Sequence, residues 1–189
     1  MKQWKKLMML LSVFTLSGCA LLNPEPSAVV MFGEEEVIRT TMSDYSSDVE
    51  KRLSFSVKKE TLEGRTVIYI PRPSMEALVT ERLIYTLDRG KAKPLKKIES
   101  NRNRQSFAKK EPILPKELYY STTYEGEIAI GKEPLRYADV VVMLDQGAYD
   151  EVEGAEETME IVRFKNDELA HILPKLEENI AVESVQAIE

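Results

Sequence analysis

One thiol and one imidazole are the side chains of this 189-residue chain best suited to nucleophilic or acid–base chemistry, and they belong to Cys19 and His171. A single cysteine cannot close an internal disulfide, and one cysteine with one histidine cannot robustly build a zinc cluster or a Cys–His–Asn site. His171 precedes Ile172 in an apolar-patterned segment, where a histidine at the solvent edge or one with its hydrogen bonds satisfied is expected rather than a catalyst. Cys19 follows the small residues Ser17 and Gly18, which would give a protease access to the backbone. Its thiol is a natural nucleophile for alkylation.

Residues 1–18 have the layout of an export signal, and residues 16–19 resemble the lipobox of bacterial lipoproteins. Three lysines precede an apolar run at 7–14. That run of about 8–10 residues is too short for a membrane span, which needs about 20. The sequence Leu-Ser-Gly-Cys at 16–19 carries the resemblance. It implies cleavage after Gly18, a diacylglyceryl thioether on Cys19, and an acyl chain such as palmitate on the new amino group. Several acyl chains anchor a protein firmly to a membrane.

The resemblance also implies a location and a division of the chain. Ala20, because it is not Asp, favours the inner leaflet of an outer membrane, facing the periplasm. Residues 19–28 contain Pro24 and Pro26 and are expected to form a short lipidated tether. Residues 29–189 are long enough for one domain with its own core, predicted to lie in the periplasm.

The overall charge argues against nucleic acid as a partner. The chain has 26 Lys and Arg against 32 Asp and Glu, a net charge of −6, with 43% apolar residues. Removal of residues 1–18 takes three lysines, so the mature chain carries 23 basic and 32 acidic side chains, a net charge of −9. Export and this negative charge both disfavour nucleic-acid binding.

A basic segment at residues 89–110 is the strongest candidate for a contact surface. It has nine cations against the single acid Glu99, few apolar residues, and the expected form of a mobile surface loop. The cations could contact anionic headgroups or lipid phosphates, dock on an acidic partner, fold back on the acids of 145–160, or simply solvate the loop. They are Arg89, Lys91, Lys93, Lys96, Lys97, Arg102, Arg104, Lys109 and Lys110.

Other chemical signatures are missing from the sequence. It has no GxSxG elbow, no phosphate-binding loop, no GxGxxG, no HExxH and no CxxC. No enzyme activity, cofactor or metal is therefore expected. Two weaker alternatives stay open: a pair of carboxylates of the glycosidase type, and calcium binding at 145–150, against which a solvated acidic loop over 145–160 is favoured.

The first half of the predicted domain favours strands joined by turns. Alternating apolar residues at 53–57 and a β-branched, aromatic run at 66–70 predict a hairpin that turns at Glu63-Gly64. A helix over 47–61 is the competing interpretation, because the same residues also fit a 3.6-residue period. After Pro71 and Pro73, a helix over 75–87 is expected, with a strand at 83–87 as its alternative.

The second half predicts further strands and a last helix. Residues 118–130 are strand-like, with a bend at Gly126, and the apolar run at 137–144 is expected to be a central strand. A short strand at 160–164 should precede a helix from about 167 to 180, kinked or split at Pro174. The tail after 183 is expected to fray. The predicted class is α+β, a mostly antiparallel sheet with one or two packed helices.

A second resemblance covers part of the chain at residues 70–95. Ile70-Pro71-Arg72-Pro73, followed by Thr80, Arg82, Tyr85 and Pro94-Leu95, resembles auxiliary lipoproteins of lipid-transporting ABC systems. It departs from them where the basic segment replaces an aromatic-Ala pair. The main hypothesis is a lipid-anchored, non-enzymatic scaffold or accessory subunit of an envelope assembly, with a protein partner. An accessory lipoprotein of an ABC system is the alternative, and a two-carboxylate hydrolase is third.

Overall fold

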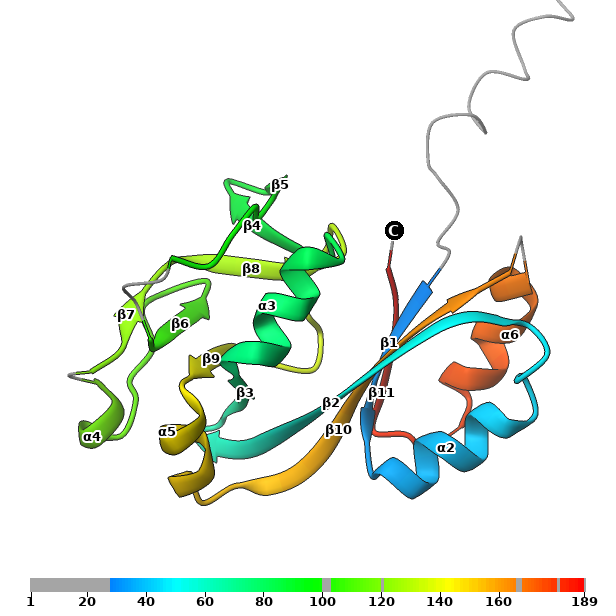
Figure 1. The fold of residues 1–189 in the computed structure, drawn as a ribbon, viewed down its shortest axis with the longest axis horizontal. Coiled ribbons are helices and arrows are strands. Elements are labelled where there is room, and N and C mark those ends of the chain that lie inside the picture. Colours follow the sequence, from blue (N-terminus) through cyan, green and yellow to red (C-terminus); the bar gives the residue numbers. More distant parts are fainter. Residues whose placement is uncertain (1–27, 100–102, 120, 166–167, 180, 189) are drawn as a thin grey trace, which may run out of the picture.

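The computed structural model describes residues 28–99, 103–119, 121–165, 168–179 and 181–188, and these form two β-sheets and five helices (Figure 1). In chain order the elements are β1 (Ala28–Gly33), α2 (Glu35–Ser43), β2 (Val49–Leu62), β3 (Arg65–Pro71), α3 (Arg72–Thr80), β4 (Ile84–Asp88), β5 (Lys91–Pro94), β6 (Gln105–Ala108), α4 (Lys116–Tyr119), β7 (Thr123–Tyr124), β8 (Glu127–Ile130), β9 (Val140–Leu144), α5 (Gln146–Glu151), β10 (Ala155–Phe164), α6 (Glu168–Glu177) and β11 (Ser184–Ile188).

The larger sheet has eight strands in the order β11-β1-β10-β2-β3-β9-β6-β7, and the smaller has the order β5-β4-β8. The strand pairs of the described chain are antiparallel, apart from β3 with β9 and β6 with β7. The longest pairing joins β2 to β10, from Val49 opposite Phe164 to Lys59 opposite Ala155. The α+β class and the mostly antiparallel sheet are therefore confirmed.

The central strands are buried on both faces, because successive side chains point to opposite sides of the sheet. In β3, Ile68 and Ile70 join one apolar core, while Val67 and Tyr69 join another. All five residues of β9 are buried, which confirms the expected central strand. Its long run of apolar residues is what a strand covered on both faces requires.

Helices and the small sheet supply the covering layers. On one face, α3 and β4 pack on the large sheet through Met75, Leu78 and Ile84. On the other face, α2 and α6 form a second core around β1, through residues such as Ile38 and Leu169. A third core lies under α5, next to β3 and β9. Figure 1 shows α2 and α6 at one end of the molecule, with α3, α5 and the small sheet at the other.

The structure decides the alternatives left open in the first half. The predicted hairpin is present, with β2 and β3 joined at Glu63-Gly64, where both residues have positive φ. The competing helix over 47–61 is wrong, since that range lies mostly in β2. The predicted helix over 75–87 is too long: α3 covers 72–80, and the strand alternative holds for β4. Helix α2 was not predicted.

Several predicted loops and ends are ordered elements instead. The basic segment contains the exposed strand β5 and the buried strand β6, so it is not one loop. The acidic stretch 145–160 contains α5 and most of β10 rather than a solvated loop. The tail after 183 forms β11, paired with β1. Ala28, expected in the tether, is already the first residue of β1.

The last helix and the second strand-like run also differ in detail. Helix α6 is one helix that continues three residues beyond Pro174, so the split into two helices is not observed. The amide of Glu178 still reaches the Pro174 carbonyl at 3.0 Å. Residues 118–130 do not form one strand, because α4, β7 and β8 share this range, and Gly126 has a φ of 87° between the two strands.

Candidate functional site

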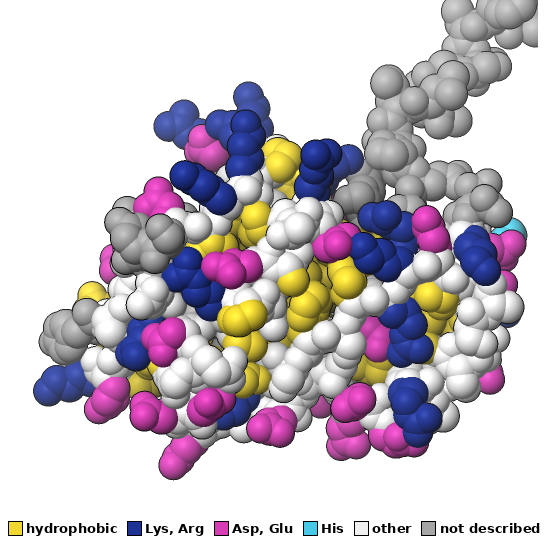
Figure 2. Space-filling view, viewed as in Figure 1, with side chains coloured by type: hydrophobic (Ala, Val, Ile, Leu, Met, Phe, Trp, Pro, Cys, Tyr) yellow, Lys and Arg dark blue, Asp and Glu magenta, His cyan; other side chains and the backbone are white. Residues whose placement is uncertain are grey.

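The strands β4 and β5, with the residues that follow to 97, form a surface that we call the basic hairpin. It carries five of the nine predicted cations, and all five are exposed. None of their side chains has a hydrogen bond or ion pair with another described residue. Figure 2 shows Lys and Arg side chains gathered over this hairpin, and carboxylates concentrated along the opposite edge of the molecule. The five are Arg89, Lys91, Lys93, Lys96 and Lys97.

The remaining predicted cations are not part of the basic hairpin. Arg104 is partly buried, and its Nε donates to Asp145 Oδ2 at 2.8 Å. Lys109 and Lys110 are exposed but follow β6, at the end of that strand away from Arg104. Arg102 and the predicted lipidation residue Cys19 lie outside the described residues. The structure therefore divides the eight described cations into one exposed group of five and three separate positions.

A cleft lies between α4 and α5, and sequence reasoning missed it. Its volume is about 390 Å³. We call it the α4–α5 cleft. Two large apolar residues in the same part of the chain are unusually exposed: Ile113 at 65% and Tyr119 at 46%. The lining combines apolar residues with a rim of carboxylates: Pro115, Leu118, Ala148 and Val152, then Glu60, Glu117, Glu151 and Glu153, with Tyr69 and Arg104.

Two polar contacts fix the walls of this cleft. The Asp145 carboxylate accepts the Ala148 amide at 3.1 Å, so it caps α5 while it also pairs with Arg104. The hydrogen bond from Arg104 holds the pKa of Asp145 below its ordinary value. Opposite, the Tyr69 hydroxyl donates to Glu60 at 2.8 Å, and burial followed by this contact raises the Tyr69 pKa. Both pKa shifts keep these two residues in their ordinary states at neutral pH, Asp145 ionised and Tyr69 protonated.

A buried lysine ties α5 to the sheet beneath the cleft. The ammonium group of Lys58 donates to the carbonyl oxygens of Tyr149, Asp150 and Val152, at 2.9, 3.2 and 2.9 Å. These carbonyls lie in the last turn of α5 and just beyond it, where a cation is favoured. Lys58 is only 7% exposed, and its nitrogen lies 5.0 Å from the centre of the Tyr149 ring.

A second polar cluster on the sheet brings two carboxylates together. Carboxylate oxygens of Glu157 and Glu183 both lie 2.6 Å from the Tyr137 hydroxyl, whose one proton they share, and both residues pair with Lys59. Burial opposes the charge of Lys59, but the two carboxylates outweigh it and raise the Lys59 pKa. The Lys59 contact lowers the Glu183 pKa. Lys59 thus bridges the two carboxylates, and the Tyr137 ring stacks on the Phe32 ring with their centroids 4.5 Å apart.

The described residues contain few other candidates for chemistry. His171 is exposed on α6, as the sequence indicated. No group of three or more His, Cys, Asp or Glu side chains within the described ranges could hold a metal ion. No helix in the same part of the chain is long and apolar enough to cross a membrane. The absence of an enzyme activity, a metal and a cofactor stays a prediction.

The α+β domain follows a sequence segment that resembles a bacterial lipoprotein signal, and the family match places the chain among lipoproteins. The profile of an uncharacterised lipoprotein family matches residues 27–189, so the chain belongs to that family. No curated protein sequence matches the chain. The crystal structure of a lipoprotein from Bacillus anthracis has a similar fold, with a TM-score of 0.77 and 23% sequence identity, over 86% of this chain and 98% of that one. The likeness extends through nearly the whole described domain and concerns the fold alone.

Proposed function

We propose that this lipoprotein is a lipid-anchored, non-enzymatic docking subunit of a protein assembly in the cell envelope, and that the α4–α5 cleft binds a segment of its protein partner. The observation that carries the proposal is the combination of this cleft with the exposed side chains of Ile113 and Tyr119. Apolar and aromatic groups of this size, next to a concave surface, are typical of protein interfaces.

The rim of the cleft indicates the chemistry of the partner. Its four glutamates, Glu60, Glu117, Glu151 and Glu153, carry more negative charge than Arg104 balances, since Arg104 already pairs with Asp145. A partner segment with apolar residues flanked by Lys or Arg would match both the lining and the rim. Burial of the apolar residues would supply most of the affinity, and the rim charges would select the partner and speed its approach.

The same contacts support binding rather than catalysis in this cleft. Glu60 is committed to Tyr69, and Asp145 is committed to Arg104 and to the cap of α5. General acid–base catalysis needs a group that can change its protonation near the working pH, and the Arg104 contact, which lowers the pKa of Asp145, keeps that carboxylate ionised there. The anchor is proposed to place the domain in the periplasm, on the inner leaflet of the outer membrane, as Ala20 predicts.

An accessory role in lipid transport would need space for an acyl chain between sheet and helix. The apolar space between the large sheet and α3, lined by Phe32, Met75 and Leu78 among others, has a volume of about 10 Å³. A cavity of that size is at the limit for one water molecule. The packing of the described residues therefore favours the docking subunit over the lipid-handling alternative.

Crosslinking in cells tests the proposed function. A photo-crosslinking amino acid is placed at Ile113 or Tyr119 beside the cleft, and at Lys175 on α6 as the control position. We expect one envelope protein to crosslink from the two cleft positions and not from Lys175. Crosslinks to transporter subunits and phospholipid would support the lipid-transport alternative instead.

Charge reversal on the rim gives a matched pair of variants. Glu151→Lys with Glu153→Lys changes the rim, and Glu177→Lys with Glu178→Lys makes the same change at exposed positions in and after α6. The crosslink should disappear only in the rim variant, because electrostatic complementarity acts at the interface. The same proteins captured from all three probe positions, or equal effects of the two variants, would overturn the proposal.

A further inference from the structure

The basic hairpin holds positive charge that the fold does not neutralise. Five exposed cations lie within residues 88–99, against the carboxylates of Asp88 and Glu99. Elsewhere the lysines of β2 are used internally: Lys51 pairs with Glu81, and Lys59 pairs with Glu157 and Glu183. Like charges on one short hairpin repel each other, so an external anionic surface would relieve this repulsion.

The hairpin also presents apolar side chains, on the face opposite Lys91 and Lys93. The register of β4 and β5 places Tyr85 opposite Pro94 and Leu87 opposite Ala92. Cross-strand pairs share a face of the sheet, so these four side chains lie together on the face away from Ile84 and its core. Pro94 is exposed and the other three are half-buried. A hairpin with tyrosine and short apolar groups on one face and lysines that alternate with them along β5 suits the boundary between water and a lipid bilayer.

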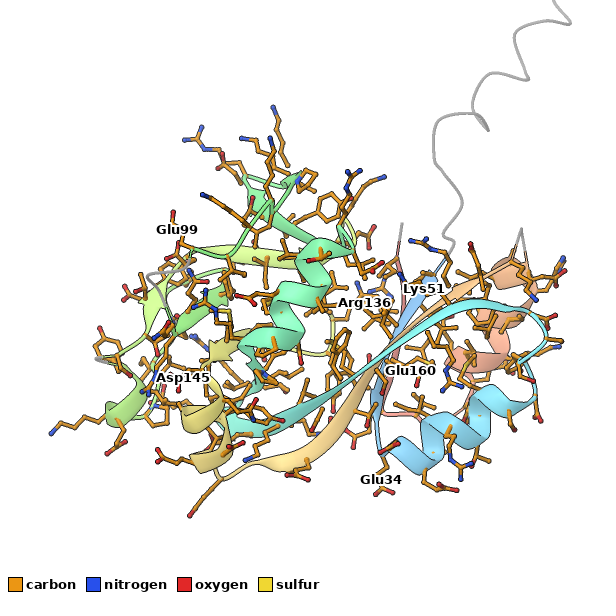
Figure 3. The ribbon with its side chains drawn as sticks, viewed as in Figure 1. Glu34, Lys51, Glu99, Arg136, Asp145 and Glu160 are labelled. Atoms are coloured by element: carbon orange, nitrogen blue, oxygen red, sulfur yellow. The ribbon has the colours of Figure 1, made fainter. Side chains whose placement is uncertain are left out.

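The start of the domain lies on the same side of the molecule as this hairpin, in the view of Figure 1. Figure 1 shows the first residue of β1 and the β4–β5 hairpin both on the upper side, while α4, α5 and the start of α2 lie below. Figure 3 places Lys51 on the upper side as well, and Glu34 at the lower edge. Ala28 is nine positions after Cys19. Even fully extended, this stretch reaches about 30 Å, so the start of β1 stays within that distance of the lipid anchor.

We propose that the basic hairpin binds the anionic phospholipid headgroups of the leaflet that holds the Cys19 lipid, so that the domain lies on the membrane in one orientation. The hairpin then faces the bilayer, and the α4–α5 cleft faces the aqueous side. The carboxylates along the lower edge are kept away from the anionic surface by the same electrostatics. This inference goes beyond the proposed function and needs no protein partner.

A probe attached at one position can measure this orientation in the lipidated mature chain. Cys19 is the single cysteine and its thiol is used by the lipid, so an introduced cysteine provides the only free thiol. A fluorophore is attached at Pro94→Cys on the hairpin, or at Glu35→Cys at the start of α2, beyond the other end of β1. Spin-labelled phospholipid quenches the fluorophore only when it lies close to the bilayer.

In phosphatidylcholine vesicles with about 30% phosphatidylglycerol, we expect quenching at Pro94→Cys and little at Glu35→Cys. The difference should largely vanish in pure phosphatidylcholine. Each cation close to an anionic surface adds favourable binding free energy. Reversal of four lysines should therefore lower the fraction of molecules in the proposed orientation roughly tenfold or more. Those changes are Lys91→Glu, Lys93→Glu, Lys96→Glu and Lys97→Glu.

A second set of reversals separates lipid contact from other roles. Exposed lysines elsewhere, changed in the same number, should leave the quenching intact: Lys109→Glu, Lys110→Glu, Lys116→Glu and Lys175→Glu. Lysines on an edge strand such as β5 also protect it from pairing with other chains. The Lys→Glu changes keep β5 charged, so this protection is retained in the variant. Equal quenching at both probe positions in anionic vesicles, or quenching that survives the hairpin reversal, would overturn the proposal. Neither result depends on whether the cleft binds a protein.

Discussion

Replacing Lys58 by methionine should show how strongly β2 and α5 are held together. Its ammonium group is the shared donor for the carbonyls of Tyr149, Asp150 and Val152, and no described carboxylate pairs with it. A hydrogen bond to a charged group contributes about 1.5–3 kcal/mol. Burial of the ammonium group offsets part of the three bonds. We therefore expect Lys58→Met to lower the free energy of unfolding by about 3 kcal/mol.

The assay is urea and thermal unfolding of the mature chain, followed by far-ultraviolet circular dichroism. Tryptophan fluorescence is unsuitable because Trp4, the single tryptophan, lies in the predicted signal peptide. A loss of about 3 kcal/mol corresponds to a Tm lower by about 6–12 °C for a domain of this length. Lys51→Met breaks an ion pair with Glu81 that is partly exposed, so it should cost less than about 1 kcal/mol. Equal losses for the two variants would refute the reasoning.

Three further predictions follow from other contacts. Gly131→Ala should destabilise the fold more than Gly90→Ala, although both glycines have positive φ. An added Cβ at residue 131 would lie 2.8 Å from the Ile188 side chain, whereas one at residue 90 would meet nothing within 4 Å. The urea midpoints of the two variants measure the difference. The Arg104 contact lowers the pKa of Asp145 in the folded state. The stability that ionised Asp145 contributes is complete above its unfolded-state pKa and is lost as pH falls through its lower folded-state pKa. Asp145→Asn should therefore make the free energy of unfolding depend less on pH below about pH 4. Cys19→Ala should leave the chain uncleaved or release it from the membrane, and unchanged mass and fractionation would contradict the lipid anchor.

The elements that the sequence predicted correctly are those whose residue pattern lies within one short stretch of the chain. The β2–β3 hairpin combines a period of two with a Glu63-Gly64 turn, both of which are encoded within about 20 residues. Strand β9 is an uninterrupted apolar run with the length of a strand. The sequence also contains a signal for helix α2, namely acidic residues in its first turn and the apolar pair Ile38 and Met42 four residues apart. In the structure both apolar side chains are fully buried.

The parts that the sequence did not predict depend on contacts between distant residues. Strand β6 has four residues between charged segments, too few for a period, and it is buried because β9 lies beside it. Strand β11 looks like a terminal tail until it pairs with β1, more than 150 residues earlier. The α4–α5 cleft likewise needs β2, α4 and α5 to meet. The sequence also did not show that Arg104 is separate from the other cations, because its partner Asp145 lies about 40 residues later in the chain.

Salt should separate the two attachments that this lipoprotein is proposed to make. The acyl chains on Cys19 hold the chain by apolar burial, which moderate salt does not weaken. The basic hairpin acts through charge, and at physiological salt the Debye length is about 8 Å, so its cations count only when they touch the headgroups. Raising the salt should therefore free the hairpin while the protein stays on the membrane. Because the tether reaches about 30 Å, the freed domain could then tilt, and the α4–α5 cleft would no longer face one direction. Loss of quenching at Pro94→Cys in high salt, without release of protein from the vesicles, is the expected result. Quenching that resists salt would mean that Tyr85 and Leu87, rather than the lysines, hold the hairpin at the bilayer.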